Sequence, residues 1–251
     1  MSSRGSVGFF MELLMPLYTI AGFTFDLVSP SDALKRLCRG YEAELGAVAD
    51  HEIVSPKDEI AAYREKHGTV SDAAAEISLT YEKICRFLLA KDALFLHAAV
   101  IEANGTAYAF SAPSGTGKST HIALWKHTYG DSVHILNGDK PILRFENDVV
   151  YAYGTPFCGK EHWNENRKVR LGGICFLSRG ETDEIRKITP KEALTPLLRQ
   201  ILLNGGTDAV MQTMALADKL LSSVPLYALS CTPTENAARL SYETMTKRST
   251  R

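Results

Sequence analysis

The first hydrophobic pattern along the chain is an alternation that is typical of a half-buried β-strand. Apolar side chains recur mostly at every second position over Tyr18–Val28, and a second short apolar segment follows at His51–Ser55. Each segment predicts a strand. Together they indicate a small, partly β N-terminal portion over residues 1–70, which we expect to pack on a larger domain formed by residues 71–251.

Helical periodicity begins next. Apolar residues return with the period of an α-helix from residue 72 to residue 91, after Ser71 as a candidate N-cap, so an amphipathic helix is predicted there. The apolar segment 94–101 predicts a buried strand. Asn104-Gly105 is a strong hairpin signal, and residues 106–111 are the predicted returning strand.

The remaining patterns alternate between strands and helices. In chain order they predict a helix over 118–129, a strand over 133–136, a hairpin of 142–145 with 149–153, a strand over 171–177, helices over 190–203 and 207–222, a strand over 225–229 and a helix from residue 234. Strands that alternate with helices, together with hairpins, predict an α/β fold with a mixed β-sheet core and flanking helices.

Composition narrows the class of protein. The chain has 251 residues and a formal net charge of -1, which provides no overall attraction to nucleic acid or to an anionic membrane surface. No uninterrupted apolar stretch is long enough to span a bilayer. The five cysteines are scattered, without metal-ligand spacing, which favours a reducing cytoplasm in which they act as small buried hydrophobic residues. We therefore expect a cytoplasmic protein with neither nucleic acid nor membrane as partner.

A glycine-rich segment between a predicted strand and a predicted helix carries the candidate chemistry. It comprises Ala112, Pro113, Ser114, Gly115, Thr116, Gly117, Lys118, Ser119 and Thr120. Apart from alanine at the place of the first glycine, it matches the phosphate-binding loop, or Walker A pattern. In such a loop backbone N–H groups and the positive end of the following helix face a phosphate. Lys118 is expected to reach the β- and γ-phosphates, and the Ser119 hydroxyl to bind Mg²⁺.

Asp139 is the second candidate. It follows the predicted strand 133–136, at the strand end where a carboxylate would face the phosphates. A carboxylate there can help to hold Mg²⁺, or can accept a proton from an attacking hydroxyl as general base. The structural alternative is a turn residue, because Asn-Gly-Asp-Lys-Pro is also a good turn sequence.

These motifs resemble the catalytic domain of HPr kinase/phosphorylase. The shared features, over roughly residues 90–205, are His97, the Asn-Gly hairpin, Ser-Ala-Pro-Ser-Gly-Thr-Gly-Lys-Ser-Thr and Leu-Asn-Gly-Asp-Lys-Pro. The resemblance is closer still to the small stand-alone relatives, some of them encoded beside ribosomally made peptides such as lasso peptides. It implies a nucleotide-binding core like that of phosphoenolpyruvate carboxykinases, with Asp139 as base and metal contact. The family often has two adjacent aspartates, and the first is Gly138 here, so a division of labour between two carboxylates, as in the relatives that also act as phosphorylases, is not expected.

Three further residues are candidates for catalysis. The stand-alone relatives carry a similar Gly-Lys, here Gly159-Lys160, and a similar Asn-Arg stretch, here Asn166-Arg167. Lys160 and Arg167 could bring cations to a transferring phosphoryl group, and a solvated basic loop is the alternative. His97 has two interpretations, a residue near the phosphate or acceptor, and a hydrogen-bonded structural histidine.

The resulting hypothesis is an ATP- and Mg²⁺-dependent kinase that phosphorylates a hydroxyl, with a serine of a peptide or protein as the favoured acceptor. A ribosomally made precursor peptide is one such acceptor, GTP is the alternative nucleotide, and a homo-oligomer is left open. The competing hypotheses are a kinase for free serine or another metabolite, a regulatory protein that binds ATP without transferring a phosphoryl group, and a motor-type or switch NTPase.

Overall fold

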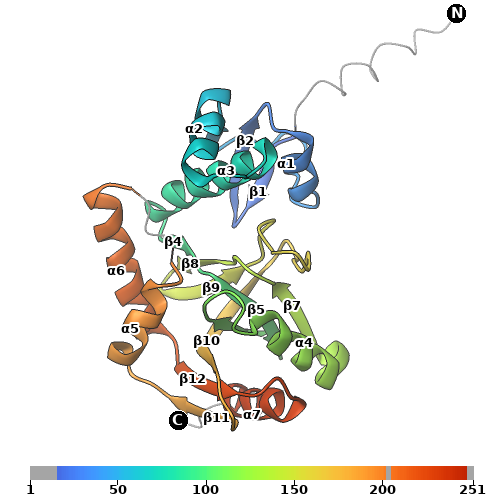
Figure 1. The fold of residues 1–251 in the computed structure, drawn as a ribbon, viewed down its shortest axis with the longest axis vertical. Coiled ribbons are helices and arrows are strands. Elements are labelled where there is room, and N and C mark those ends of the chain that lie inside the picture. Colours follow the sequence, from blue (N-terminus) through green and yellow to red (C-terminus); the bar gives the residue numbers. More distant parts are fainter. Residues whose placement is uncertain (1–15, 202–204, 248–251) are drawn as a thin grey trace, which may run out of the picture. The chain divides into compact units, whose positions relative to one another are not determined.

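The computed structural model describes residues 16–201 and 205–247. Contacts within the chain divide it into two compact units, Met1–Thr80 and Tyr81–Arg251. The division falls inside helix α3 (Asp72–Leu89), which is labelled in Figure 1. The boundary expected from the sequence, after residue 70, lies just before this helix begins. None of the helices in the described part of the chain is both long and apolar enough to cross a membrane.

Unit 1 contains a three-stranded sheet. Its elements before α3 are β1 (Tyr18–Ile20), β2 (Phe23–Val28), α1 (Asp32–Leu37), β3 (His51–Val54) and α2 (Lys57–His67). The strand order is β1-β2-β3, with β1 antiparallel and β3 parallel to β2.

The prediction of one continuous strand over Tyr18–Val28 is wrong. Ala21 and Gly22 both have positive φ angles, 54° and 78°, and this left-handed turn folds the segment into a hairpin. Helices α1 and α2 were not predicted. No residue of α2 is buried, and its apolar residues stand together at 60–63 instead of recurring with the helical period, so no apolar stripe reveals the helix.

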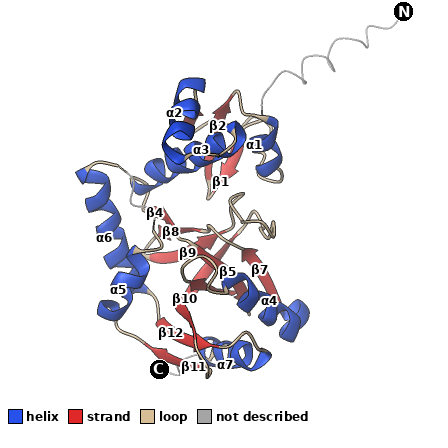
Figure 2. Cartoon of the chain, in the orientation of Figure 1, coloured by secondary structure: helices blue, strands red, loops and turns tan. Residues whose placement is uncertain are grey.

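Unit 2 is built on a nine-stranded mixed sheet, whose strands are red in Figure 2. The strands are β4 (Ala93–Phe95), β5 (Ala98–Ala103), β6 (Thr106–Ser111), β7 (Val133–Asn137), β8 (Ile142–Glu146), β9 (Val149–Tyr153), β10 (Lys168–Arg179), β11 (Glu184–Lys187) and β12 (Leu226–Cys231). Their order is β4-β8-β9-β10-β6-β5-β7, with β12 beside β10 and β11 beside β12. Because β10 is parallel to β6 and β12 but antiparallel to β9, the predicted mixed α/β fold is confirmed.

The single strand predicted over 94–101 is two strands. β4 pairs with β8, whereas β5 pairs with β6 and β7. The chain changes partners at His97, whose N–H donates to the Gln200 carbonyl, and the next N–H, of Ala98, donates to the Asp139 carbonyl. This change of partner places His97 beside the end of β7.

Four helices cover the two faces of the sheet: α4 (Lys118–Tyr129), α5 (Pro190–Leu198), α6 (Thr207–Ser223) and α7 (Glu235–Thr246). On one face Leu197 and Leu220, from α5 and α6, join a core cluster. On the other face lie α4 and α7 (Figure 1), and Ile122, Trp125 and Met245 from these helices belong to a second core cluster. The helix predicted over 190–203 is too long, since α5 ends at Leu198, and residues 202–203 lie outside the described residues.

All five cysteines are free and buried, as expected for small hydrophobic residues.

Candidate functional site

The glycine-rich loop joins the buried strand β6 to helix α4. Gly115 and Gly117 have φ angles of 77° and 121°, which L side chains rarely adopt. Nothing lies within 4 Å of a Cβ built at either position, so the backbone conformation, and not crowding, requires glycine. Gly117 is the N-cap of α4, and the first turn of the helix carries no acidic residue. The positive end of α4 is therefore free to attract an anion.

An open cavity of about 520 Å³ lies over this loop. It is lined by His97, Ser114, Gly115, Gly117, Lys118, Ser119, Thr120, Gly138, Asp139, Gly159, Lys160 and Glu161. The cavity thus brings together most of the residues proposed from the sequence, and they come from three separate segments of the chain.

Lys118 is the first residue of α4, directly after the loop glycines, and it is 7% exposed. Its Nζ donates to the Ala112 carbonyl oxygen at 2.7 Å and lies 3.0 Å from Nε2 of His97. Burial lowers the pKa of Lys118, the nearby carboxylate of Asp139 raises it, and the ammonium of Lys140 lowers it further. Asp139 thereby helps Lys118 to keep its proton.

Asn137 orients the turn after β7. Its buried side chain accepts the backbone N–H groups of Asp139 and Lys140 at 3.0 and 2.8 Å, and donates to the Thr155 carbonyl at 3.0 Å. An asparagine that bonds its own backbone two residues further on is a standard way to shape a turn. The Asp139 carboxylate is therefore held by a bonded turn at the cavity wall.

Two cationic or polar groups contact the Asp139 carboxylate. Lys140 Nζ lies 2.7 Å from Oδ2, and His97 Nε2 lies 3.2 Å from Oδ1. Burial by itself raises the pKa of Asp139, but hydrogen bonds from His97 and Lys140 outweigh burial, so the pKa lies well below its ordinary value of 3.8. Asp139 is consequently ionised at neutral pH.

His97 connects the lysine and the carboxylate. Its Nδ1 lies 2.7 Å from Oε1 of Gln200, an atom that can only accept, so Nδ1 carries a proton in this arrangement. In the neutral ring Nε2 then accepts from Lys118, whereas in the imidazolium Nε2 donates to Asp139. Of the two interpretations from the sequence, the structure therefore places His97 in the cavity, and it also gives the ring a structural hydrogen bond.

Two residues proposed from the sequence lie outside this cavity. Arg167 is paired with Glu102 and Glu165, at 2.5 Å in each case, and these pairs raise its pKa although burial lowers it. Thr116 lines a neighbouring pocket. The structure does not bring the Arg167 guanidinium to Lys118 and Asp139.

Sequence reasoning missed Lys140, Asn137 and Gln200. The first two stand beside Asp139 in the motif, and their position around a strand-end carboxylate was an available signal. Gln200 is 103 residues from His97, and no local pattern connects them.

Gly138 stands where the resembled family often has a second aspartate. A Cβ added there would lie 2.8 Å from the Cys158 backbone oxygen, which is closer than real Cβ atoms come. The backbone of the Gly159 loop therefore leaves no room for a second carboxylate beside Asp139.

The described residues contain no group of three or more His, Cys, Asp or Glu side chains that could hold a metal by themselves. A divalent ion at the Ser119 hydroxyl and the Asp139 carboxylate needs further oxygens from a ligand. This donor set fits Mg²⁺, which usually keeps one or two carboxylates and binds together with phosphates.

Comparison with known proteins assigns the family. A search of curated proteins finds no significant match. Seventy-two chains of solved structures match, among them the Hpr(Ser) kinase/phosphatase from Coxiella burnetii, at 12% identity and a TM-score of 0.34, over 60% of this chain and 92% of that chain. The family model described as SynChlorMet cassette protein ScmC matches residues 73–236, well over half of the chain. The chain therefore belongs to the ScmC family.

Proposed function

We propose that the protein is an ATP- and Mg²⁺-dependent kinase that transfers the γ-phosphoryl group of ATP to a hydroxyl. The observation that carries the proposal is the shared cavity: the glycine-rich loop, Lys118 and Ser119 form one wall, and the ionised carboxylate of Asp139 stands in the same cavity. Phosphate binding and proton acceptance are thus available at one place.

The loop and the start of α4 bind the triphosphate. Backbone N–H groups of residues 114–119 and the helix dipole attract the phosphate oxygens, and Lys118 places its ammonium among them. Ser119 and Asp139 would hold Mg²⁺, which neutralises phosphate charge when bound. GTP is the alternative nucleotide, since none of these groups contacts a base.

Asp139 acts as the general base. The acceptor oxygen forms a bond to the γ-phosphorus while the bond to the β–γ bridging oxygen breaks, so that ADP leaves with that electron pair. The hydroxyl proton passes to Asp139, which is unprotonated at neutral pH. Lys160 is exposed at the rim of the cavity and offers a cation to the transferring group.

A serine in a peptide or protein is the favoured acceptor. The support is the resemblance of the loop and of the Leu-Asn-Gly-Asp-Lys-Pro motif to HPr kinase, which phosphorylates a serine of a protein. A ribosomally made precursor peptide belongs to this class of acceptor.

The test is mass spectrometry of reactions with ATP, Mg²⁺, serine-containing peptides, free serine and other hydroxy-metabolites. We expect one phosphoryl group to be added to a peptide. The substitution Lys118→Ala should abolish this transfer, and the control substitution Lys191→Ala, at an exposed lysine, should leave it intact. Transfer to a free metabolite would identify a small-molecule kinase. ATP binding with no transfer to any acceptor would contradict the kinase and favour a regulatory ATP-binding protein.

A further inference from the structure

A second pocket, of about 300 Å³, adjoins the cavity over the glycine-rich loop, here called the phosphate cavity, along the start of α4. Gly117 and Thr120 line both of them. The other walls come from the glycine-rich loop at Thr116, from Leu124 of α4, and from the last residues of β10 and β12 with the residues that follow each strand. A molecule that extends from the loop past Thr120 therefore enters this pocket directly.

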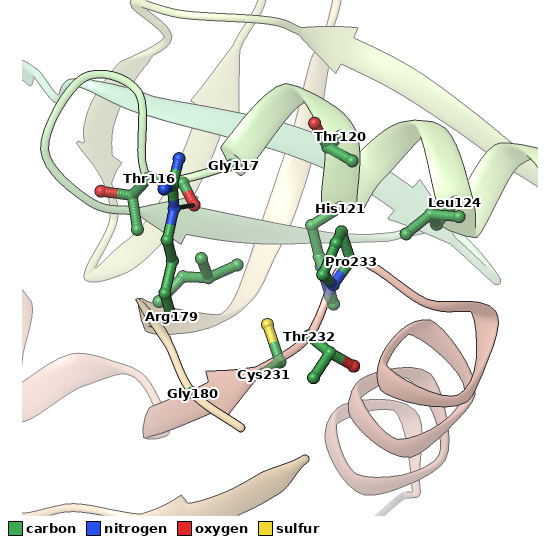
Figure 3. Close-up of a pocket in the computed structure, with 11 residues that line it drawn as sticks. Thr116, Gly117, Thr120, His121, Leu124, Arg179, Gly180, Cys231, Thr232 and Pro233 are labelled. Atoms are coloured by element: carbon green, nitrogen blue, oxygen red, sulfur yellow. Dashed lines mark hydrogen bonds between the residues drawn. The ribbon is translucent and has the colours of Figure 1, made fainter. Parts of the chain in front are cut away.

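Arg179 forms one wall of the pocket. Its Nη2 donates to the Gly115 carbonyl at 2.6 Å and its Nε to the Thr116 carbonyl at 3.4 Å. Both donors lie in the plane of the guanidinium, so these two bonds do not use its flat faces, and the Arg179 side chain is exposed. In Figure 3 Arg179 stands on one side of the pocket, with Pro233 on the other side and Cys231 between them.

The pocket is much less charged than the cavity beside it. His121 lines it, and burial lowers the pKa of His121 to about 4, so the ring is neutral at pH 7. Arg179 is then the one charged group among the described residues that line the pocket, whereas the phosphate cavity is lined by Lys118, Lys160 and two carboxylates. Leucine, proline and cysteine side chains supply apolar surface, and threonines and glycines complete the lining.

The far wall is held in place by hydrogen bonds. Asp183 accepts from the backbone N–H of Thr232 at 2.7 Å, from its hydroxyl at 2.9 Å, and from the Thr234 hydroxyl at 3.3 Å. These bonds tie the loop after β12 to the loop before β11. The pocket is therefore formed before any ligand binds.

We infer that this pocket is the nucleoside subsite of the proposed nucleotide site. A flat, neutral heteroaromatic base lies against the guanidinium face of Arg179, opposite Pro233 and Leu124, and the ribose passes Thr120 towards the phosphates. Apolar walls with a few fixed polar groups suit such a base, and a guanidinium stacks well on an aromatic ring. The inference rests on the proposed function, because it requires the phosphates to bind at Lys118.

The test compares two ligands that differ only by the nucleoside: Mg²⁺–ATP and Mg²⁺–tripolyphosphate. In the wild-type protein we expect ATP to bind more tightly by about tenfold or more, as stacking of one base would produce. Leu124→Trp fills the pocket and should reduce this ratio to about one, while the affinity for tripolyphosphate stays unchanged. His127→Trp, one turn further along α4 and outside the pocket, should keep the wild-type ratio.

Each outcome separates the two proposals. If Leu124→Trp leaves the ratio at its wild-type value, the nucleoside lies elsewhere and the subsite is refuted, although the phosphate site survives. If neither ligand binds to the wild-type protein, both the subsite and the proposed function fail. Retained tripolyphosphate binding also reports that the Leu124→Trp variant is folded.

A second measurement needs no variant. Light-induced cross-linking of 8-azido-ATP to the wild-type protein, followed by peptide mapping, should mark residues 179–180 or 231–233. Competition by ATP should remove the cross-link. A cross-link that ATP removes but that maps to any other part of the chain would overturn the assignment.

Discussion

Replacing Asp139 by asparagine should slow phosphoryl transfer by orders of magnitude while leaving nucleotide binding in place. The substitution keeps the shape of the side chain and removes its charge and its basicity. The turn that holds it is unaffected, because Asn137 bonds the backbone N–H groups of residues 139 and 140. Lys118 and the loop amides that bind the phosphates also remain.

The size of the effect follows from the role. A positioned general base contributes about 10²–10⁴-fold to the rate, so kcat should fall by that factor, which corresponds to about 3–5 kcal/mol in the barrier. Without Mg²⁺, ATP should bind as tightly as before or more tightly, because Asp139 no longer repels the phosphates. The carboxylate also raises the pKa of Lys118, so ATP binding by the variant should weaken at a lower pH than in the wild type.

The assay is the initial rate of ADP release with the phosphorylated acceptor quantified, together with titration calorimetry of ATP. Glu184→Gln, on the exposed strand β11, is the matched control for loss of one carboxylate. A kcat for Asp139→Asn within about threefold of the wild-type value would refute the role of Asp139 as base. Loss of ATP binding with an unchanged thermal unfolding curve would show that Asp139 is itself needed to bind the phosphates, and would refute the expectation that binding survives its replacement.

Three other substitutions test the surroundings of the site. Lys140→Met removes a cation that keeps the pKa of Asp139 below 3.8, so that pKa should rise. Activity and stability that depend on ionised Asp139 are present above this pKa and are lost as the pH falls through it. In the variant this loss should therefore occur at a higher pH than in the wild type. An acid limb of the pH–kcat/KM profile that does not move would contradict this. Gly138→Ala places a Cβ 2.8 Å from the Cys158 oxygen, and chemical denaturation should show a loss of about 1–3 kcal/mol of unfolding free energy. Ser241→Ala removes a hydroxyl that accepts the indole N–H of Trp125 and is hydrogen-bonded to the buried imidazole of His121. This change should lower the free energy of unfolding by about 1–3 kcal/mol. An unchanged free energy of unfolding would show that these two side chains find other partners.

Local elements of the fold could be predicted because their causes lie within a few residues. The apolar stripe of α3, the Asn104-Gly105 hairpin and the glycine that ends α4 are all visible in short windows of sequence. The segment 94–101 was predicted as one strand because both of its halves are apolar. Its division into β4 and β5 depends on the pairing of β4 with β8, which lies far along the chain, while β5 pairs with β6 and β7; no local pattern shows that β4 has a different partner.

The sequence by itself determined the loop and the carboxylate of the candidate site. The glycines supply positive φ angles at the start of a helix, and Lys118 and Ser119 follow them directly, so their placement depends only on local backbone conformation. The position of Asp139 could also be predicted locally, because it stands just after the end of a buried strand.

Only the tertiary structure decided what surrounds these groups. It placed Gln200 against His97, which is 103 positions away in the sequence. It also paired Arg167 with Glu102 of β5, so that Arg167 does not face the cavity over the glycine-rich loop. It also put the residues after β12 beside the glycine-rich loop and so formed the second pocket. The physical reason is that backbone conformation and capping act over one helical turn or one strand, whereas contacts between distant side chains depend on strand order and on how the two faces of the sheet are covered.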